Sequence, residues 1–201
     1  MIKLYFAPRT RSVRILWLLE ELELPYELAR VEFAAPADRF FAQQTPLGKL
    51  PTIEDGDVVM CESGAIVEYI LERYGGGRLA PPVGSRERAA YLQWLHFAES
   101  TAFPPLGILV WLTLYREDGQ DHTAIIESAR ARTATGLDFL ERELGENEYL
   151  AGDFSAADIM MGFTLSAARV LGVLDDRYPK LNGYLARLEA RPAFQKAIAV
   201  E

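Results

Sequence analysis

The stretch that decides the fold is residues 49–70, KLPTIEDGDVVMCESGAIVEYI. Two short apolar segments, LPTIED and DVVMC, meet at Asp55-Gly56, a dipeptide typical of tight hairpin turns. A helical pattern begins at Glu62, and three consecutive glycines close it. Pro51 opens the first segment, and a proline is tolerated at the start of a strand or on an edge strand. The stretch therefore predicts two paired strands followed by a helix.

The residues before this stretch alternate between strand-like and helix-like patterns. A short apolar run is typical of a buried strand, and apolar residues at helical spacing between Ser12 and Pro25 predict a helix. The predicted elements are, in order, a strand at 2–6, a helix that Pro25 ends, a strand at 26–33 and a short helix or turn at 38–44. Residues 1–76 therefore predict the order βαβαββα. Residues 75–85 hold the densest cluster of glycine and proline, which indicates a linker.

The residues after the linker predict helices alone. The predicted helices lie at 85–116, 124–144, 154–171, 181–188 and 193–198. Pro104-Pro105 falls inside the first of them and predicts a kink, because proline removes a backbone hydrogen bond. The segment 154–171 is apolar almost all round, which predicts a buried central helix. The domain organisation expected is an α/β domain at 1–76, a linker at 77–84 and an all-helical domain at 85–201.

Composition excludes several classes of function. The chain has 21 basic and 29 acidic residues and a net charge of −8, which argues against nucleic acid or an anionic membrane as the main partner. The single cysteine, Cys61, and two distant histidines provide neither a disulfide framework nor a zinc site, so no metal is expected. No signal peptide and no membrane span of about 18 apolar residues is expected. These features predict a cytoplasmic protein.

Four motifs are distributed along the chain: TRSVRILWLLEELELPYE at 10–27, TPLGKLPTIEDG at 45–56, CESGAIVEYILERY at 61–74 and FSAADIMM at 154–161. In this order and spacing they resemble the soluble glutathione transferase superfamily, and in particular bacterial and fungal members of the serine/threonine type. The resemblance implies a thioredoxin-like βαβαββα domain followed by an all-helical domain. It also implies glutathione as co-substrate, no tightly bound cofactor, and a homodimer.

The resemblance assigns the glutathione-binding residues. It implies a cis Leu50–Pro51 bond, with the Leu50 backbone exposed at a strand edge so that the ligand adds like an extra strand. Glu62 and Ser63 stand at a helix N-terminus, where unpaired N–H groups favour the γ-glutamyl carboxylate. Lys49 is the candidate for the glycyl carboxylate. Without the resemblance, an edge-strand proline, ordinary helix caps and a solvated lysine are the more common explanations of these residues.

The residue that activates the sulfur is expected in the loop after the first strand. Lowering a thiol pKa by about two units requires about 2.7 kcal/mol. One hydrogen bond to the thiolate and the nearby helix N-terminus together supply roughly this free energy. Relatives of the SRSxR type, aligned on Arg14, carry serine where Thr10 stands, so Thr10 is the first choice. Ser12 is the second and is otherwise a helix cap. Tyr5 is the third, because it resembles the strand-end tyrosine of tyrosine-type relatives.

The expected reaction is transfer of glutathione thiolate to a small hydrophobic electrophile. Its pocket is predicted between the domains, lined by Phe103, Trp111 and Tyr115, although aromatic residues at this spacing also suit a core. Cys61 is expected to be a small buried apolar residue. Two alternatives stay open: glutathione-dependent reduction of peroxides or disulfides at the same site, and a non-catalytic binding or assembly module with a transferase fold.

Overall fold

A computed structural model describes residues 1–32 and 45–200 and divides into two compact units. The first unit comprises Met1–Leu79 together with Ala190–Glu201, and the second comprises Ala80–Glu189. The predicted domain limits at 1–76, 77–84 and 85–201 remain a prediction, and the helix or turn predicted at 38–44 lies outside the described residues.

The first unit contains a mixed sheet of four strands in the order β2-β1-β3-β4. The strands are β1 (Ile2–Phe6), β2 (Tyr26–Arg30), β3 (Thr52–Asp55) and β4 (Val58–Cys61). β1 pairs parallel with β2 and antiparallel with β3, and β3 pairs antiparallel with β4. The pairing of Asp55 with Val58 and a φ of +62° at Gly56 confirm the predicted hairpin. The second strand is shorter than predicted and ends at Arg30.

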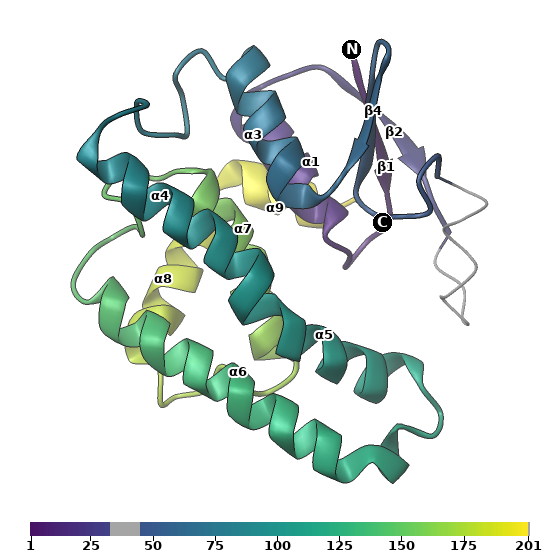
Figure 1. Ribbon diagram of the computed structural model, residues 1–201, viewed down its shortest axis with the longest axis vertical. Coiled ribbons are helices and arrows are strands. Elements are labelled where there is room, and N and C mark those ends of the chain that lie inside the picture. The colour runs from purple at the N-terminus through teal and green to yellow at the C-terminus, as the bar shows by residue number, and fades with distance from the viewer. Residues whose placement is uncertain (33–44, 201) are drawn as a thin grey trace. The chain divides into compact units, whose positions relative to one another are not determined.

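Two helices of this unit, α1 (Ser12–Glu21) and α3 (Ser63–Tyr74), lie on the same side of the sheet (Figure 1). The α1 helix begins at the predicted Ser12, and α3 begins one residue after the predicted Glu62. The amide of Gly75 closes α3 on the Leu71 carbonyl at 3.0 Å. The α3 helix is also bonded to the β3–β4 hairpin, because the hydroxyls of Tyr69 and Tyr74 donate to the buried carboxylate of Asp55. Asp55 therefore forms the predicted turn and also binds α3 to the hairpin.

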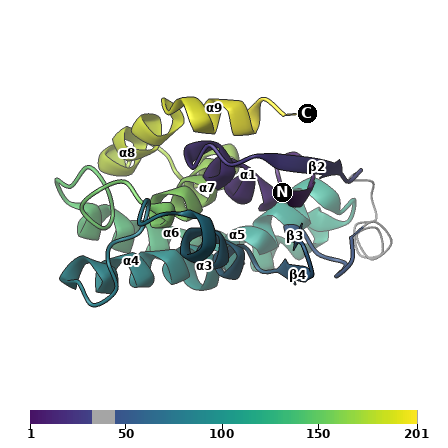
Figure 2. The same ribbon diagram turned by 90° about the horizontal axis from the view of Figure 1, so that it is seen from above.

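The last helix, α9 (Pro192–Ile198), packs alongside α1 in the first unit (Figure 2). Arg191 donates to both carboxylate oxygens of Glu21 at 2.6 and 2.8 Å, and Lys196 lies 3.2 Å from Glu20. The rings of Trp17 and Phe194 meet edge to face at 4.8 Å. This packing was not predicted, because the sequence places the helix only at the end of a helical series.

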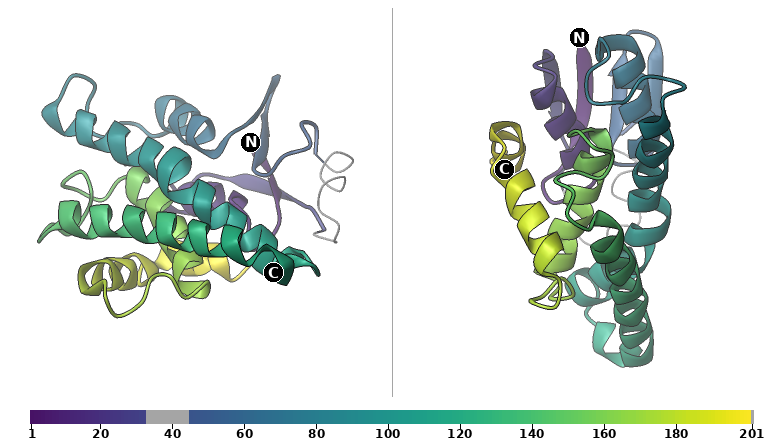
Figure 3. Two further views of the ribbon diagram at one scale, coloured as in Figure 1. Left: turned by 60° about the horizontal axis from the view of Figure 1, so that its bottom comes forward. Right: turned by 90° about the vertical axis from the view of Figure 1, so that its left-hand side faces the viewer.

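The second unit consists of helices joined by loops. Its α-helices are α4 (Arg86–Phe97), α5 (Phe103–Val110), α6 (Thr123–Leu144), α7 (Ala156–Val170) and α8 (Pro179–Glu189). Helices α4, α5 and α6 are seen best in Figure 3, and α7 contacts both α4 and α8. Ten residues of α7 are buried, which confirms the prediction of a central helix.

The first long helix of this unit changes its hydrogen-bond register before the two prolines. A π-helical turn, Ala98–Ala102, joins α4 to α5. Pro104 and Pro105 lack the N–H groups that would bond the carbonyls of Ser100 and Thr101 in an α-helix. Those carbonyls lie inside the π-helical turn, so the predicted irregularity is present one turn earlier than the prolines themselves.

The continuous helical stretch Arg86–Tyr115 corrects one expectation from the sequence. It is 30 residues long, and its most apolar 18-residue window has a mean hydropathy of 1.3, with a third of the window buried. By length and composition alone it is able to cross a membrane. Core helices of water-soluble proteins meet the same criterion, and this stretch packs against α6 and α7. The finding is therefore weak support for a membrane span.

A buried capping box begins α7. Ser155 and Asp158 bond reciprocally, as the motif FSAADIMM indicates. The fully buried Asp158 also accepts hydrogen bonds from the Leu150 amide at 3.0 Å and from the Tyr184 hydroxyl at 2.7 Å. One carboxylate thus joins the loop before α7, the N-terminus of α7, and α8.

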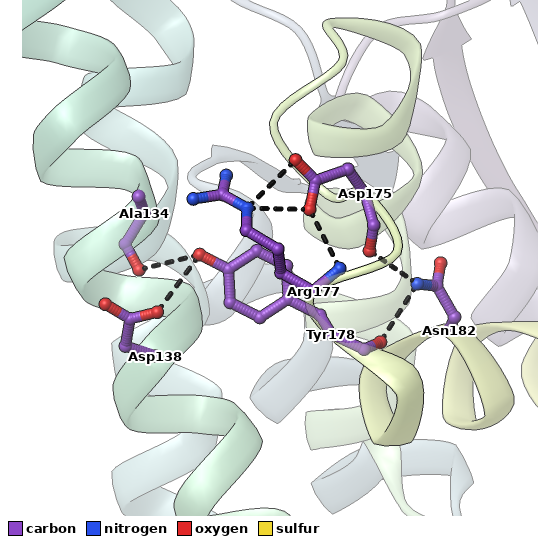
Figure 4. Close-up of polar contacts among 6 residues, drawn as sticks. All are labelled: Ala134, Asp138, Asp175, Arg177, Tyr178 and Asn182. Carbon is purple, nitrogen blue, oxygen red and sulfur yellow. Dashed lines mark hydrogen bonds and ion pairs between the residues drawn. The ribbon is translucent and has the colours of Figure 1, made fainter.

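A second polar network fastens the segment between α7 and α8 (Figure 4). The Tyr178 hydroxyl donates to Asp138 of α6 at 3.1 Å, and Asn182 donates to the carbonyls of Asp175 and Tyr178. Arg177 lies against the Asp175 carboxylate of the same loop. These contacts join the loop before α8 to α6 and to the start of α8, so the network has a structural role.

Candidate functional site

Strand register brings three sequence motifs to one end of the sheet. Tyr5 pairs with Thr52, and Thr52 pairs with Cys61. Beyond this row of paired residues, the same end of the sheet holds the C-terminus of β1, Pro51 just before β3, and Glu62 just after β4. The candidate residues of the first loop, of the proline turn and of the α3 N-terminus consequently share one edge, although they are separated by about forty residues in the sequence.

The proline turn lies against the loop that follows β1. The Leu50–Pro51 peptide bond is cis, as the resemblance implied. Leu50, Ala7 and Val31 form a small buried cluster, and the ring of Tyr5 packs against it. The residue before the proline and the first residue of the loop are therefore in contact through their side chains.

Two hydroxyls and one peptide group organise the first loop. The Thr10 hydroxyl lies 2.8 Å from the Ala7 carbonyl oxygen and 2.6 Å from the Ser12 hydroxyl. Ser12 is fully buried, accepts from the Ala7 amide at 3.2 Å and reaches the Ala7 carbonyl at 3.1 Å. Thr10 is half-buried. Of the two hydroxyls, Thr10 is thus the one that retains solvent access.

Tyr5, the third candidate for the sulfur, has a different partner. Its hydroxyl donates to the Glu54 carboxylate at 2.6 Å, and the Lys3 ammonium lies 5.1 Å from its ring centre. The hydrogen bond to Glu54, together with desolvation, raises the pKa of Tyr5 above its ordinary value. A phenol whose proton is held by a carboxylate is a poorer donor to a thiolate.

The N-terminus of α3 presents two different side chains. Glu62 is exposed, and its backbone adopts a φ of +73°, an uncommon value for a residue with a side chain. Residues held in such conformations cluster at binding sites. Ser63 is buried, and its hydroxyl accepts from the Arg14 guanidinium at 3.0 Å.

Arg14 is the site residue that sequence reasoning missed. In the sequence, Arg14 served only to align the first loop with that of relatives. In the structure its side chain is fully buried, and its guanidinium donates to the Ser63 hydroxyl. A buried guanidinium adds positive charge to the helix N-terminus, where a carboxylate would bind. The spacing of 49 residues between the two partners gives no signal in a single sequence.

The loop before the proline is held by two threonines. The Lys49 amide donates to Thr45 at 3.0 Å, and the Thr52 hydroxyl donates to the Lys49 carbonyl at 2.7 Å. The Lys49 side chain is exposed at the same end of the sheet. Its ammonium group is therefore available to a ligand carboxylate.

The remaining candidates are Cys61, at the end of β4, and three aromatic residues of the helical unit. Cys61 is a free thiol that is half-buried, which corrects the expectation of a buried apolar residue. In the helical unit, Phe103 stacks on Phe163 at 6.0 Å, and the rings of Trp111 and Tyr115 lie 6.4 Å apart. All three predicted pocket aromatics are half-buried. Within the described residues, no group of three or more histidine, cysteine or acidic side chains is arranged to hold a metal ion.

Comparison with known proteins agrees with this arrangement. The family model for the glutathione S-transferase N-terminal domain matches residues 1–72, and the model for the C-terminal domain matches residues 123–187. The chain belongs to the glutathione S-transferase family. A relative from Schizosaccharomyces pombe, glutathione S-transferase 3, is 30% identical over 96% of this chain and 85% of its own length. Glutathione S-transferase 3 of Zea mays is 33% identical over 98% of this chain and 93% of its own length.

Solved structures of glutathione S-transferases share the fold. A sphingomonad glutathione S-transferase complexed with glutathione has a TM-score of 0.81 and 26% identity, covering 98% of this chain and 96% of its own. The predicted superfamily and the predicted α/β plus all-helical fold class are thereby confirmed. The serine/threonine type stays a prediction, and so does the role of each site residue.

Proposed function

We propose that this glutathione S-transferase binds glutathione at the shared end of the sheet and activates its thiol for attack on a small hydrophobic electrophile. The observation that carries the proposal is the strand register, which gathers the first loop, Leu50-Pro51 and Glu62-Ser63. Two strand spacings measure about 10 Å, and three extended residues also span about 10 Å. An extended tripeptide therefore fits the separation between the first loop and the α3 N-terminus.

The ends of glutathione are recognised by charge. The γ-glutamyl carboxylate binds the N–H groups at the start of α3 and the Ser63 hydroxyl, over the buried Arg14. The exposed Glu62 carboxylate accepts from the γ-glutamyl ammonium, and Lys49 pairs with the glycyl carboxylate. The Leu50 backbone bonds the cysteinyl residue in the manner of an added strand.

The sulfur is activated by Thr10. Among the three candidates, only the Thr10 hydroxyl has solvent access and is bonded to a neutral carbonyl, from which it is able to turn toward the sulfur. Ser12 is buried, and the Tyr5 hydroxyl is held by the Glu54 carboxylate. The thiol proton leaves to solvent and the thiolate remains, stabilised by the Thr10 hydrogen bond. The thiolate then forms a carbon–sulfur bond with the electrophile, whose leaving group departs with the bonding pair.

The same proposal covers the substrate pocket, the location of the protein, its assembly and its domain limits. Phe103, Trp111 and Tyr115 contact the apolar part of the electrophile. The protein is cytoplasmic and works as a homodimer, with the helical domain beginning after a linker at 77–84. Light scattering on the purified protein tests the dimer. Conjugation rates for electrophiles of increasing apolar size, measured in Trp111→Ala and in wild type, test the pocket.

Calorimetric titration with glutathione, followed by a thiol-conjugation assay, tests the central claim. We expect Thr10→Val to keep binding, to raise the thiol pKa of bound glutathione and to lower the conjugation rate. Thr135→Val, which removes an exposed hydroxyl on α6, is the matched control and should leave all three values unchanged. Full activity with an unchanged thiol pKa in Thr10→Val would exclude Thr10. Absence of glutathione binding would refute the function itself.

A further inference from the structure

We propose that Ser12 is a positioning residue, which donates a hydrogen bond to the Thr10 oxygen and thereby directs the Thr10 proton to the glutathione sulfur. The inference rests on the proposed function, since it needs a thiolate at Thr10. It concerns a side chain that does not itself touch the ligand: Ser12 is fully buried, whereas Thr10 is half-buried.

The loop contains more acceptors than hydroxyl protons. Thr10 and Ser12 contribute one proton each, and the Ala7 carbonyl lies within hydrogen-bond distance of both, at 2.8 and 3.1 Å. The two hydroxyl oxygens lie 2.6 Å from each other, so one of them donates to the other. Two backbone amides fix the oxygens: the Ala7 amide donates to Ser12 at 3.2 Å, and the Ser12 amide donates to Thr10 at 3.3 Å.

A thiolate at the site selects one arrangement of these protons. Because a thiolate only accepts, the hydroxyl that meets it, Thr10, must turn its proton toward the sulfur. Its oxygen accepts from the Ser12 amide and still has one lone pair for the Ser12 hydroxyl. The contact between the two hydroxyls at 2.6 Å is shorter than the alternative contact of Ser12 with the Ala7 carbonyl at 3.1 Å. The order of donation becomes Ala7 amide to Ser12, Ser12 to Thr10, and Thr10 to sulfur.

This series of hydrogen bonds strengthens the bond from Thr10 to the sulfur. A hydroxyl oxygen that accepts hydrogen bonds becomes a better donor through its own proton, because successive bonds polarise one another. Ser12 also removes the competing state in which Thr10 donates to it rather than to the sulfur. If the contribution equals one ordinary hydrogen bond, the thiol pKa rises by about half a unit to one unit when the Ser12 hydroxyl is lost. No proton is transferred between the hydroxyls; only their directions are fixed.

The test is a double-mutant cycle on the thiol pKa of bound glutathione, read from the ultraviolet absorbance of the thiolate across pH. The variants are Ser12→Ala, Thr10→Val and the double variant, with Ser128→Ala on the exposed face of α6 as control. We expect Ser12→Ala to raise the pKa by about half a unit to one unit and Thr10→Val by about one to two units. The double variant should match Thr10→Val, because Ser12 acts only through Thr10.

The outcomes separate this inference from the function on which it rests. If wild type fails to bind glutathione, or binds it with an unshifted thiol pKa, the proposed function and the positioning role of Ser12 both fail. If Thr10→Val raises the thiol pKa and Ser12→Ala does not, only the positioning role of Ser12 is refuted. A Ser12 effect that persists in the Thr10→Val background would show that Ser12 acts by holding the loop.

Ser12→Cys covers the case in which Ser12→Ala does not fold. The thiol still offers an acceptor to the Ala7 amide but is a weak donor. It should therefore raise the thiol pKa of bound glutathione in the same direction while circular dichroism and glutathione affinity stay near wild type. An unchanged thiol pKa in this variant would overturn the proposal.

Discussion

Replacing Asp158 by alanine should be among the most destabilising single changes in the helical unit. The carboxylate is fully buried and accepts four hydrogen bonds: from the amides of Leu150 and Ser155 at 3.0 and 2.8 Å, and from the hydroxyls of Ser155 and Tyr184 at 3.0 and 2.7 Å. Alanine leaves two backbone N–H groups buried without an acceptor, because backbone amides cannot turn away as hydroxyls can. At about 1–3 kcal/mol for each orphaned donor, the expected loss is roughly 3–5 kcal/mol.

Three further variants divide this total. Asp158→Asn keeps one carbonyl oxygen but turns an NH2 group toward donors, so we expect a loss of about 2 kcal/mol. Tyr184→Phe and Ser155→Ala each remove one partner and should cost about 1 kcal/mol. The free energy of unfolding in urea, followed by far-ultraviolet circular dichroism, measures all four, and hydrogen exchange of the α7 amides assigns the loss to this helix. A loss below about 1 kcal/mol for Asp158→Ala would refute the assignment of the carboxylate as the common acceptor.

The same carboxylate predicts an unusual dependence on pH. Burial raises the pKa of Asp158 above its ordinary value, against the opposing effect of its four donors. A folded-state pKa above the unfolded value means that the native state binds a proton first as the pH falls. The stability of wild type relative to Asp158→Asn should therefore increase as the pH falls from neutrality through the folded pKa of Asp158. A decrease would mean that the donors outweigh burial.

Three other predictions concern the first unit. Asp55→Asn should lower the urea midpoint at neutral pH, because hydrogen bonds, chiefly from tyrosine hydroxyls, lower the pKa of Asp55 in the folded protein. The difference from wild type should vanish as the pH falls below the ordinary aspartate range. Asp57→Asn, at an exposed position in the same turn, is the control. Arg14→Met should weaken glutathione binding by roughly ten- to a hundredfold in calorimetry, through loss of the bond that orients Ser63. Arg191→Ala should speed proteolytic removal of α9 without changing glutathione affinity, because it breaks the bidentate pair that fastens this helix to α1.

The elements that the sequence predicted well are those with local signals. The hairpin at Asp55-Gly56, the start of α1 at Ser12 and the box at the start of α7 each depend on residues within a few positions of one another. Turn geometry, helix capping and apolar periodicity are properties of such short windows. The second strand ended three residues earlier than its alternating pattern suggested, since alternation does not reveal where a partner strand stops pairing.

The features that were missed depend on pairs distant in the sequence. Arg14 bonds Ser63 across 49 residues, and Arg191 bonds Glu21 across 170. In a single sequence, a buried arginine beneath a serine is indistinguishable from a solvated arginine on an amphipathic helix. Only the packing of α1 against α3 makes the first of these contacts.

The choice among three hydroxyls shows most clearly what structure adds to sequence. Thr10, Ser12 and Tyr5 all lie in or beside the loop that follows β1, and each carries a hydroxyl that is able to donate a hydrogen bond. They differ in where their protons are already held: Tyr5 by a carboxylate, Ser12 inside a buried loop, and Thr10 by a peptide carbonyl and a second hydroxyl at 2.6 Å. A neutral partner is easier to leave for a thiolate than a charged one. We therefore propose that the competing acceptors around each hydroxyl determine which one activates the sulfur, and those acceptors are set by the packing of the loop.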